Sequence, residues 1–255
     1  MFPLRDENPT EIFPIFTLLL IAANVAVWFY VQGAGMDPGT LQQAVCTYGA
    51  IPSEITGQTR PLPPELREYG LVCPQGGITW VAILTSMFLH GGWLHLIGNM
   101  WFLWIFGNNI EDSMGHLRFV LFYVLTGIAA AAGHILSTPG SQVPIVGASG
   151  AISGIMGAYL VLYPRVRVYT LFIIIIIIRV IPVPAWVMLG YWFLIQLLSG
   201  TATGAAEAGV AFWAHIGGFV AGVALIKPFE RRDLVAAKKA HVKLPRQEIR
   251  NRGWW

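Results

Sequence analysis

The sequence contains six apolar stretches, each close to the length needed to cross a bilayer. Of its 255 residues, 55% are hydrophobic and 11% are charged, whereas a soluble domain carries about 25% charged residues. The stretches are continuous, unlike the alternating ten-residue strands of an outer-membrane barrel. We therefore predict an all-α polytopic membrane protein with six transmembrane helices, at about Phe13–Val31, Gly91–Ile110, Phe119–Leu136, Val146–Leu162, Pro184–Leu198 and Gly209–Leu225.

The positions of lysine and arginine predict how the chain is oriented. These residues accumulate on the cytoplasmic side of a membrane, and nine of the sixteen follow the last apolar stretch. Six crossings then place the N-terminus inside as well, which leaves Arg60 and Arg67 as the two positive charges outside. The predicted regions are a short cytoplasmic N-terminus over 1–12, a membrane domain over 13–226 and a basic tail over 227–255 that suits anionic lipid headgroups.

A long first outer loop is predicted between the first two spans, over about residues 32–78. It is rich in proline and glycine, and ordered loops of this length are commonly functional. Both cysteines of the chain, Cys46 and Cys73, lie in it. An oxidising exterior permits a disulfide between them. Two free thiols are an equally open alternative, because pairing cannot be deduced from a sequence.

Two further apolar segments are expected to lie along the membrane rather than across it. In "ITWVAILTSMFLHGGW", the part before Gly91 and Gly92 is predicted to be a helix at the outer interface, and the second span to begin after the glycines. The segment 168–181 is short between its flanking charges, so we expect an interfacial or partly buried segment on the cytoplasmic side.

Polar side chains within the predicted spans are few. Such residues are expensive in hydrocarbon and are therefore candidates for function. Because His95 and Asn99 are four residues apart, they project from one helical face. His134 lies near the outer end of its span and can instead face lipid headgroups. The full set is His90, His95 and Asn99 on the second span, His134 on the third, Gln196 on the fifth and His215 on the sixth.

Two stripes of glycine predict that the fourth and sixth spans approach each other closely. They are Gly150, Gly154 and Gly157 on the fourth span, and Gly218 and Gly222 after His215 on the sixth. If the stripes meet, His215 lies against Ser149, and a histidine within hydrogen-bond reach can take the proton of a serine. The alternative is that the glycines serve packing alone and the histidines only join helices.

The depths of these residues in the membrane are expected to be similar. Asn99 follows Gly92 by seven residues and His215 follows Gly209 by six, which places both about 10 Å below the outer boundary. Ser149 lies only about three residues into its span. It matches the other two less well, unless its helix begins below the surface.

Four segments, in this order, resemble the rhomboid family of intramembrane serine proteases. They are "HGGWLHLIGNM", "IEDSMGHLRF", "GASGAISGIMGAY" and "AHIGGFVAG", and the resemblance covers about residues 80–226. It implies a catalytic dyad of Ser149 and His215 without an acidic third residue. It also implies an oxyanion hole formed by His95, Asn99 and the backbone amide of Ser149.

The resemblance further implies roles for residues around this dyad. Supporting roles fall to His90, Gly147, Gly150 and Gly218, with His90 acting through hydrogen bonds. Trp192 is similar to an aromatic residue that lines the lateral substrate gate of the family, although a tryptophan that only packs or faces lipid is equally open. One departure is Ser153, which occupies a position where some family members carry an aromatic ring against the catalytic histidine.

The expected function is therefore cleavage of single-pass transmembrane proteins near the outer face of a bacterial inner (cell) membrane, with both termini cytoplasmic. No cluster of Cys, His and carboxylate residues has metal-ligand spacing, so we expect no metal or organic cofactor. Nucleic-acid binding has little support. One alternative is a non-catalytic rhomboid-like protein that binds transmembrane helices. Another is a proton-relaying transporter using His95 and His215, although no inverted repeat supports it.

Overall fold

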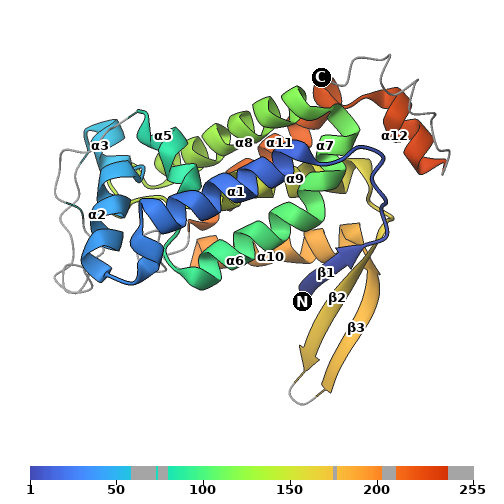
Figure 1. Ribbon diagram of the computed structural model, residues 1–255, viewed down its shortest axis with the longest axis horizontal. Helices are drawn as coiled ribbons and strands as arrows, with labels where there is room; N and C mark the ends of the chain where they lie inside the picture. The colour runs from blue at the N-terminus through green and yellow to red at the C-terminus, as the bar shows by residue number, and fades with distance from the viewer. Residues whose placement is uncertain (59–72, 74–79, 175–176, 203–210, 241–255) are drawn as a thin grey trace.

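A bundle of roughly parallel helices makes up most of the structure (Figure 1). The computed structural model describes residues 1–58, 73, 80–174, 177–202 and 211–240. Three of its helices are long and apolar enough to cross a membrane: α8 (His116–Ser137), α10 (Ala185–Ala202) and α11 (Phe212–Phe229). Two shorter apolar helices, α1 (Ile15–Tyr30) and α9 (Ser149–Leu162), complete five of the six predicted stretches. Gly209, where the sixth was expected to begin, lies outside the described residues.

The remaining predicted stretch is a helical run with a change of pitch. It consists of α6 (Trp93–Phe102), the π-helical turn η3 (Leu103–Gly107) and α7 (Asn108–Met114). As predicted, this run begins directly after Gly92. The short helix expected before the glycines is also present, as α5 (Ala82–Thr85) continued by the 3-10 turn η2 (Ser86–Phe88).

At one end of the bundle, the chain after α1 forms short elements (Figure 1). These are η1 (Gly33–Gly35), α2 (Pro38–Tyr48) and α3 (Pro52–Thr56). A disulfide joins Cys46 to Cys73, which settles the pairing that the sequence left open. Ala50 and Ile145 exchange two backbone hydrogen bonds, which attach this end to the segment that leads into α9. Residues 59–72 and 74–79 of the predicted outer loop lie outside the described residues.

A small antiparallel sheet at the opposite end corrects the all-helical expectation. Its strands are β1 (Phe2–Asp6), β2 (Arg167–Ile174) and β3 (Ile177–Pro184), in the order β1-β2-β3. The described residues of this segment, 168–174 and 177–181, therefore lie in two antiparallel strands that project beside the helices (Figure 1). Its many β-branched isoleucines and valines favour strands over helices. The N-terminal residues close the sheet by pairing with β2.

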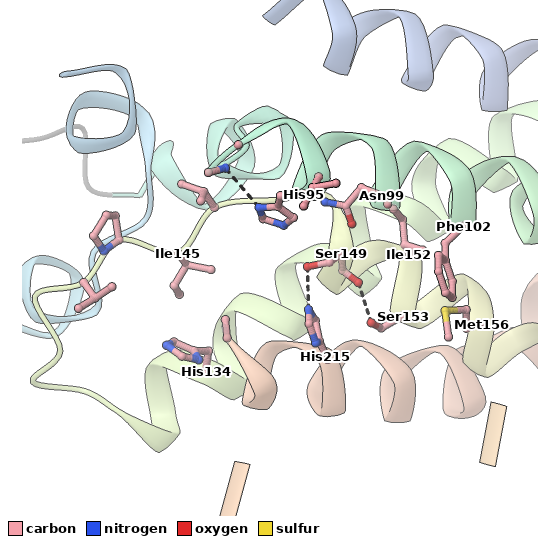
Figure 2. Close-up of a pocket in the computed structure, with 18 of the residues that line it drawn as sticks. His95, Asn99, Phe102, His134, Ile145, Ser149, Ile152, Ser153, Met156 and His215 are labelled. Atoms are coloured by element: carbon pink, nitrogen blue, oxygen red, sulfur yellow. Dashed lines mark hydrogen bonds between the residues drawn. The ribbon is translucent and has the colours of Figure 1, made fainter. Parts of the chain in front are cut away.

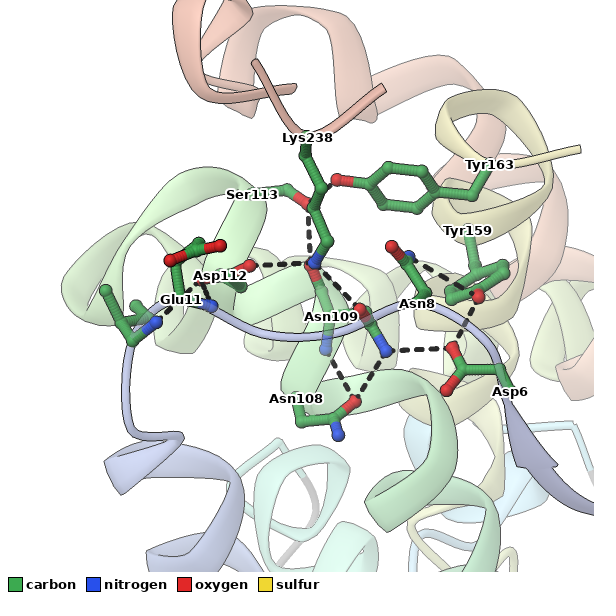
Figure 3. Close-up of polar contacts among 11 residues, drawn as sticks. Asp6, Asn8, Glu11, Asn108, Asn109, Asp112, Ser113, Tyr159, Tyr163 and Lys238 are labelled. Atoms are coloured by element: carbon green, nitrogen blue, oxygen red, sulfur yellow. Dashed lines mark hydrogen bonds and ion pairs between the residues drawn. The ribbon is translucent and has the colours of Figure 1, made fainter. Parts of the chain in front are cut away.

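Buried polar residues tie the elements together at this same end (Figure 3). Lys238, on α12 (Arg232–Lys239), lies 2.7 Å from Asp112 and donates to Asn109 at 2.8 Å. Asp6, at the end of β1, accepts hydrogen bonds from the Tyr159 hydroxyl and from the amide of Asn109. The cluster thereby connects the N-terminal strand, α7, α9 and α12.

Glu111, from one of the quoted segments, has a structural partner in the same region. Its carboxylate accepts hydrogen bonds from the backbone amides of Phe16 and Thr17 and from the Thr17 hydroxyl. These amides belong to the first turn of α1, where backbone donors lack helical partners. A carboxylate there is also stabilised by the helix dipole. Glu111 thus fixes the start of α1 against α7.

The partly buried carboxyl of Asp6 should make the stability of the fold depend on pH. Burial raises the pKa of Asp6 to about 6, from 3.8. The folded protein therefore binds this proton more tightly than the unfolded chain, so stability falls as pH rises from about 4 through about 6. Asp6→Asn removes the charge and keeps an oxygen acceptor for Tyr159 and Asn109. We expect the variant to be more stable at pH 7.5, by about 1–3 kcal/mol, in thermal unfolding in detergent.

The control is Asp37→Asn. Asp37 is exposed and accepts hydrogen bonds from the backbone amide and hydroxyl of Thr40 at the start of α2, which lower its pKa. Its charge is stabilising, so Asp37→Asn should lose stability at pH 7.5. A loss of stability at pH 7.5 in Asp6→Asn as well would contradict the prediction for Asp6.

Candidate active site

Ser149 and His215 face each other across two helices that are distant in sequence. Ser149 is the first residue of α9, and His215 lies in the first turn of α11. The serine Oγ lies 2.8 Å from His215 Nε2, within hydrogen-bonding distance (Figure 2). The juxtaposition expected from the glycine stripes is therefore present.

The glycine stripes themselves are in backbone contact. A Cβ atom on Gly218 would lie 2.0 Å from the carbonyl oxygen of Gly150, and one on Gly222 would lie 1.9 Å from that of Gly154. A Cβ on Gly157 would likewise lie 2.3 Å from the carbonyl oxygen of Phe219. Any larger residue at these positions must push α9 and α11 apart, so the predicted close packing of the two spans is confirmed.

α9 begins below the end of α8, because Gly150 lies against Ala130, seven residues before α8 ends. It has 14 residues, against 22 in α8, which makes it about 21 Å long against about 33 Å. The preceding segment is not helical and is held by backbone bonds, including one from Gly147 N–H to the Ser86 carbonyl. The predicted span began at Val146, and the helix itself starts at Ser149. The depth of Ser149 in the membrane relative to Asn99 and His215 stays a prediction.

Three N–H donors surround the space beside Ser149. His95 Nδ1 accepts the Gly91 backbone N–H at 3.2 Å, so in the neutral ring the proton is on Nε2. The Asn99 side-chain nitrogen is buried and bonds to no atom of the described residues. The backbone N–H of Ser149 opens a helix, where amides lack helical partners. This arrangement can stabilise a negative oxygen.

Gly147 is what leaves the space for these donors open. A Cβ atom there would lie 2.7 Å from His95 Nε2 and 3.5 Å from the Asn99 amide nitrogen. Its φ of +120° is also a conformation that residues with a side chain rarely adopt. Conformation and space therefore both require glycine at this position.

A cavity of about 820 Å³ opens beside the Ser149–His215 pair (Figure 2). His134 is buried and lies on its wall, so it does not simply face headgroups as one reading of the sequence allowed. Phe102, Ile152 and Met156 supply apolar surface to the same cavity. The other lining residues include Gly91, Gly92, Trp93, His95, Gly98, Asn99, Val143, Ile145, Ser153 and Trp192.

His90 is placed differently from the expectation. Its ring is fully buried, and neither ring nitrogen bonds to an atom of the described residues. The ring instead contacts His95 edge to face, with 5.1 Å between centroids. Gln32 holds the backbone of His90 with two hydrogen bonds. His90 therefore lies directly against His95, and its expected supporting role stays a prediction.

Trp192 contacts the ring of His215 from α10. The ring centroids lie 5.8 Å apart with an interplanar angle of 40°. Ser153, which stands where some family members carry an aromatic residue, donates a hydrogen bond to the Ser149 carbonyl at 2.6 Å. The aromatic contact to His215 therefore comes from α10 rather than from α9.

Gln196 also reaches the site from α10. Its side-chain oxygen lies 2.7 Å from His215 Nδ1. Sequence reasoning identified Gln196 as a polar residue within a span but did not assign it to the site. The available signal was its position one helical turn after Trp192, on the same face.

A metal centre finds no support among the residues described. No group of three or more His, Cys, Asp or Glu side chains in that part of the chain is arranged to hold a metal ion. The polar groups of the cavity are instead a serine, imidazoles and amides.

These features place the protein among helical membrane proteins that carry a serine–histidine pair beside a cavity. The chain belongs to the rhomboid family, because the family model described as "Rhomboid domain" matches residues 78–232. That range contains Ser149, His215, His95, Asn99 and Gln196. The family is one of integral membrane proteins and includes serine proteases.

Three relatives illustrate the similarity. The "Rhomboid protease GluP" of Bacillus subtilis is 32% identical over 147 residues, 58% of this chain and 24% of the relative. "RHOMBOID-like protein 6, mitochondrial" of Arabidopsis thaliana is 44% identical over 87 residues, 34% of this chain and 27% of the relative. "Rhomboid protein 1, mitochondrial" of Saccharomyces cerevisiae is 29% identical over 167 residues, 62% of this chain and 44% of the relative. The match thus spans less than half of each relative.

The contact between Ser149 and His215 can be tested without a substrate. We expect a fluorophosphonate probe to label the protein at Ser149, because the histidine activates the hydroxyl. His215→Ala should slow labelling by about a hundredfold or more. The measurement is probe incorporation over time, with the labelled peptide identified by mass.

The matched control is Ser137→Ala. The Ser137 hydroxyl is exposed and bonds to the Gly133 carbonyl within its own helix. Its loss should leave labelling unchanged. Equal labelling of the wild type and His215→Ala would show that the histidine does not activate Ser149.

Proposed function

We propose that the chain is an intramembrane serine endopeptidase in which Ser149 is the nucleophile and His215 the general base. The observation that carries the proposal is the 2.8 Å contact between Ser149 Oγ and His215 Nε2 at the wall of a cavity. The names of two relatives support it, "Rhomboid protease GluP" and "Putative rhomboid protease YdcA", both of Bacillus subtilis.

The proposed reaction follows from the positions of the donors and acceptors. His215 Nε2 takes the proton of the Ser149 hydroxyl as the oxygen attacks the peptide carbonyl carbon. The resulting oxyanion is stabilised by N–H groups of His95, Asn99 and the Ser149 backbone. Nε2 then gives its proton to the leaving amine, and a water molecule hydrolyses the acyl-enzyme by the same two steps.

The proposed substrates are single-pass transmembrane proteins. A carbonyl within a helix is hydrogen-bonded and shielded, so the bond to be cut must first leave its helix. Segments with glycine, proline or other weak helix formers should therefore be preferred. We further propose that Trp192, on α10, lines the path by which substrate enters. It borders the cavity and contacts the ring of His215.

We propose that six helical segments cross the membrane: α1, the run from α6 to α7, α8, α9, α10 and α11. The sheet, α12 and the basic tail then lie in the cytoplasm, and the Cys46–Cys73 disulfide lies outside, where oxidising conditions favour it. The proposed location is a bacterial inner membrane. The proposed regions are those of the sequence: 1–12, 13–226 and 227–255, although 241–255 lies outside the described residues.

Labelling of introduced cysteines with a membrane-impermeant maleimide tests this orientation. Leu136 is exposed at the end of α8, and Arg232 is exposed at the start of α12. Leu136→Cys should react in intact cells, and Arg232→Cys only after permeabilisation. The unsubstituted protein is the control, since both of its cysteines are disulfide-bonded. The reverse pattern would contradict the proposed orientation.

Cleavage of transmembrane peptides tests the enzymatic function. The purified protein is incubated with a panel of such peptides, and the cut sites are mapped by mass. We expect Ser149→Ala and His215→Ala each to lower the cleavage rate by about a thousandfold or more. Their circular dichroism should remain that of the wild type.

Ser137→Ala again serves as the control and should cleave normally. Cleavage that survives in Ser149→Ala or His215→Ala would contradict the dyad. Capture of peptides without cleavage by the wild type would favour the alternative, a non-catalytic rhomboid-like protein that binds transmembrane helices.

A further inference from the structure

We propose that Gln196 is a positioning residue that holds His215 in the protonation form a general base requires. The inference deepens the proposed protease function and rests on it. Gln196 is the one polar side chain among the five residues that α10 buries. Its side-chain oxygen lies 2.7 Å from Nδ1 of His215, whose Nε2 lies 2.8 Å from Ser149 Oγ. The three side chains therefore form a continuous hydrogen-bonded chain.

The chemical consequence concerns which ring nitrogen carries the proton. A neutral imidazole has one N–H, and the other nitrogen is an acceptor. The amide oxygen of Gln196 can only accept, so it places the proton of His215 on Nδ1. Nε2 is then left with its lone pair directed at Ser149. The opposite form would present an N–H to the serine hydroxyl and could not remove its proton.

The same contact also acts during the proton transfer. When the proton of Ser149 moves to Nε2, the imidazole becomes positively charged and both nitrogens are donors. The bond from Nδ1–H to the Gln196 oxygen then becomes charge-assisted and stronger. Gln196 therefore stabilises the state in which Ser149 Oγ attacks, although it touches neither the substrate nor the reacting atoms.

An amide suits this position better than a carboxylate. A charged side chain within the membrane is expensive, and Gln196 is buried. The amide provides an oxygen acceptor without a net charge. This accounts for a dyad that carries no acidic third residue but still has an acceptor on the far nitrogen of its histidine.

The position of Gln196 also makes the state of His215 depend on α10. Trp192, four residues earlier, contacts the His215 ring, so two neighbouring turns of α10 hold the histidine. Much of the rest of α10 is exposed, including Trp186, Leu194 and Leu198. Displacement of α10 from α11 would remove both contacts. The base is thus complete only while α10 lies against α11.

The test compares substitutions of Gln196 in the full-length protein. Gln196→Met keeps the length of the side chain and removes the acceptor, whereas Gln196→Glu keeps an oxygen at the same reach. We expect Gln196→Met to lower kcat by about ten- to a hundredfold with KM unchanged, the loss expected for a hydrogen bond to a charged group. Gln196→Glu should retain most of the wild-type kcat.

The control is Thr201→Met on the same helix. The Thr201 hydroxyl is exposed and bonds to carbonyls of its own helix, so its loss should leave kcat unchanged. Equal kcat values in Gln196→Met, Thr201→Met and the wild type would overturn the inference. A rise of KM without a fall of kcat would also overturn it, since that result would show a structural role.

A second measurement reads the protonation form without any substrate. Nitrogen NMR of histidine-labelled protein should show the His215 proton on Nδ1 in the wild type and a mixture of both forms in Gln196→Met, with the His215 signal assigned from His215→Ala. An unchanged signal in Gln196→Met would overturn the inference. Failure of the proposed function appears separately, as a wild-type protein that neither cleaves peptides nor reacts with the fluorophosphonate.

Discussion

The backbone contact between α9 and α11 is the constraint on which the rest of the site depends. Within a bilayer, the hydrophobic effect does not drive helices together, so close association relies on small residues and polar bonds. Gly218 and Gly222 lie directly against the carbonyl groups of Gly150 and Gly154. The resulting helix separation is short enough for Ser149 to reach His215. Residues that look purely structural thus determine the geometry of the reactive pair.

Polar contacts at the two ends of the bundle complement this central contact. At one end, the backbone pair of Ala50 and Ile145 holds the segment that leads into α9. At the other, the cluster around Asp6 and Lys238 holds β1, α7, α9 and α12. Both ends fix α9, the helix that carries Ser149. Its position is therefore defined along its whole length.

Much of this arrangement was predictable from the sequence because it follows from local patterns. The length of the apolar stretches, the two glycines before α6 and the spacing of the glycine stripes each translate directly into helices and contacts. The sheet was missed because a run such as the isoleucines of 173–178 is apolar in either conformation, and only its β-branched character favours a strand. β1 could not be foreseen, because its partner, β2, lies some 160 residues later in the chain.

The partner of His215 shows a second limit of sequence reasoning. The expectation of a site with two catalytic residues and no acidic third residue came from the resemblance to the rhomboid family. A neutral amide can also accept a hydrogen bond, and the contact of Gln196 depends on the rotation of α10 against α11. The spacing of residues along one helix does not indicate how that helix is rotated against its neighbour. The aromatic contact to His215 likewise comes from another helix, through Trp192 on α10.

The short length of α9 has a consequence for the surrounding lipid. At about 21 Å, the helix is shorter than the roughly 30 Å hydrocarbon layer, and a lipid-exposed helix of that length would thin the bilayer around it. Eleven of its fourteen residues are buried within the bundle, so its neighbours form most of the surface that lipid meets. The longer helices α8, α10 and α11, of 22, 18 and 18 residues, can therefore face the lipid in place of α9.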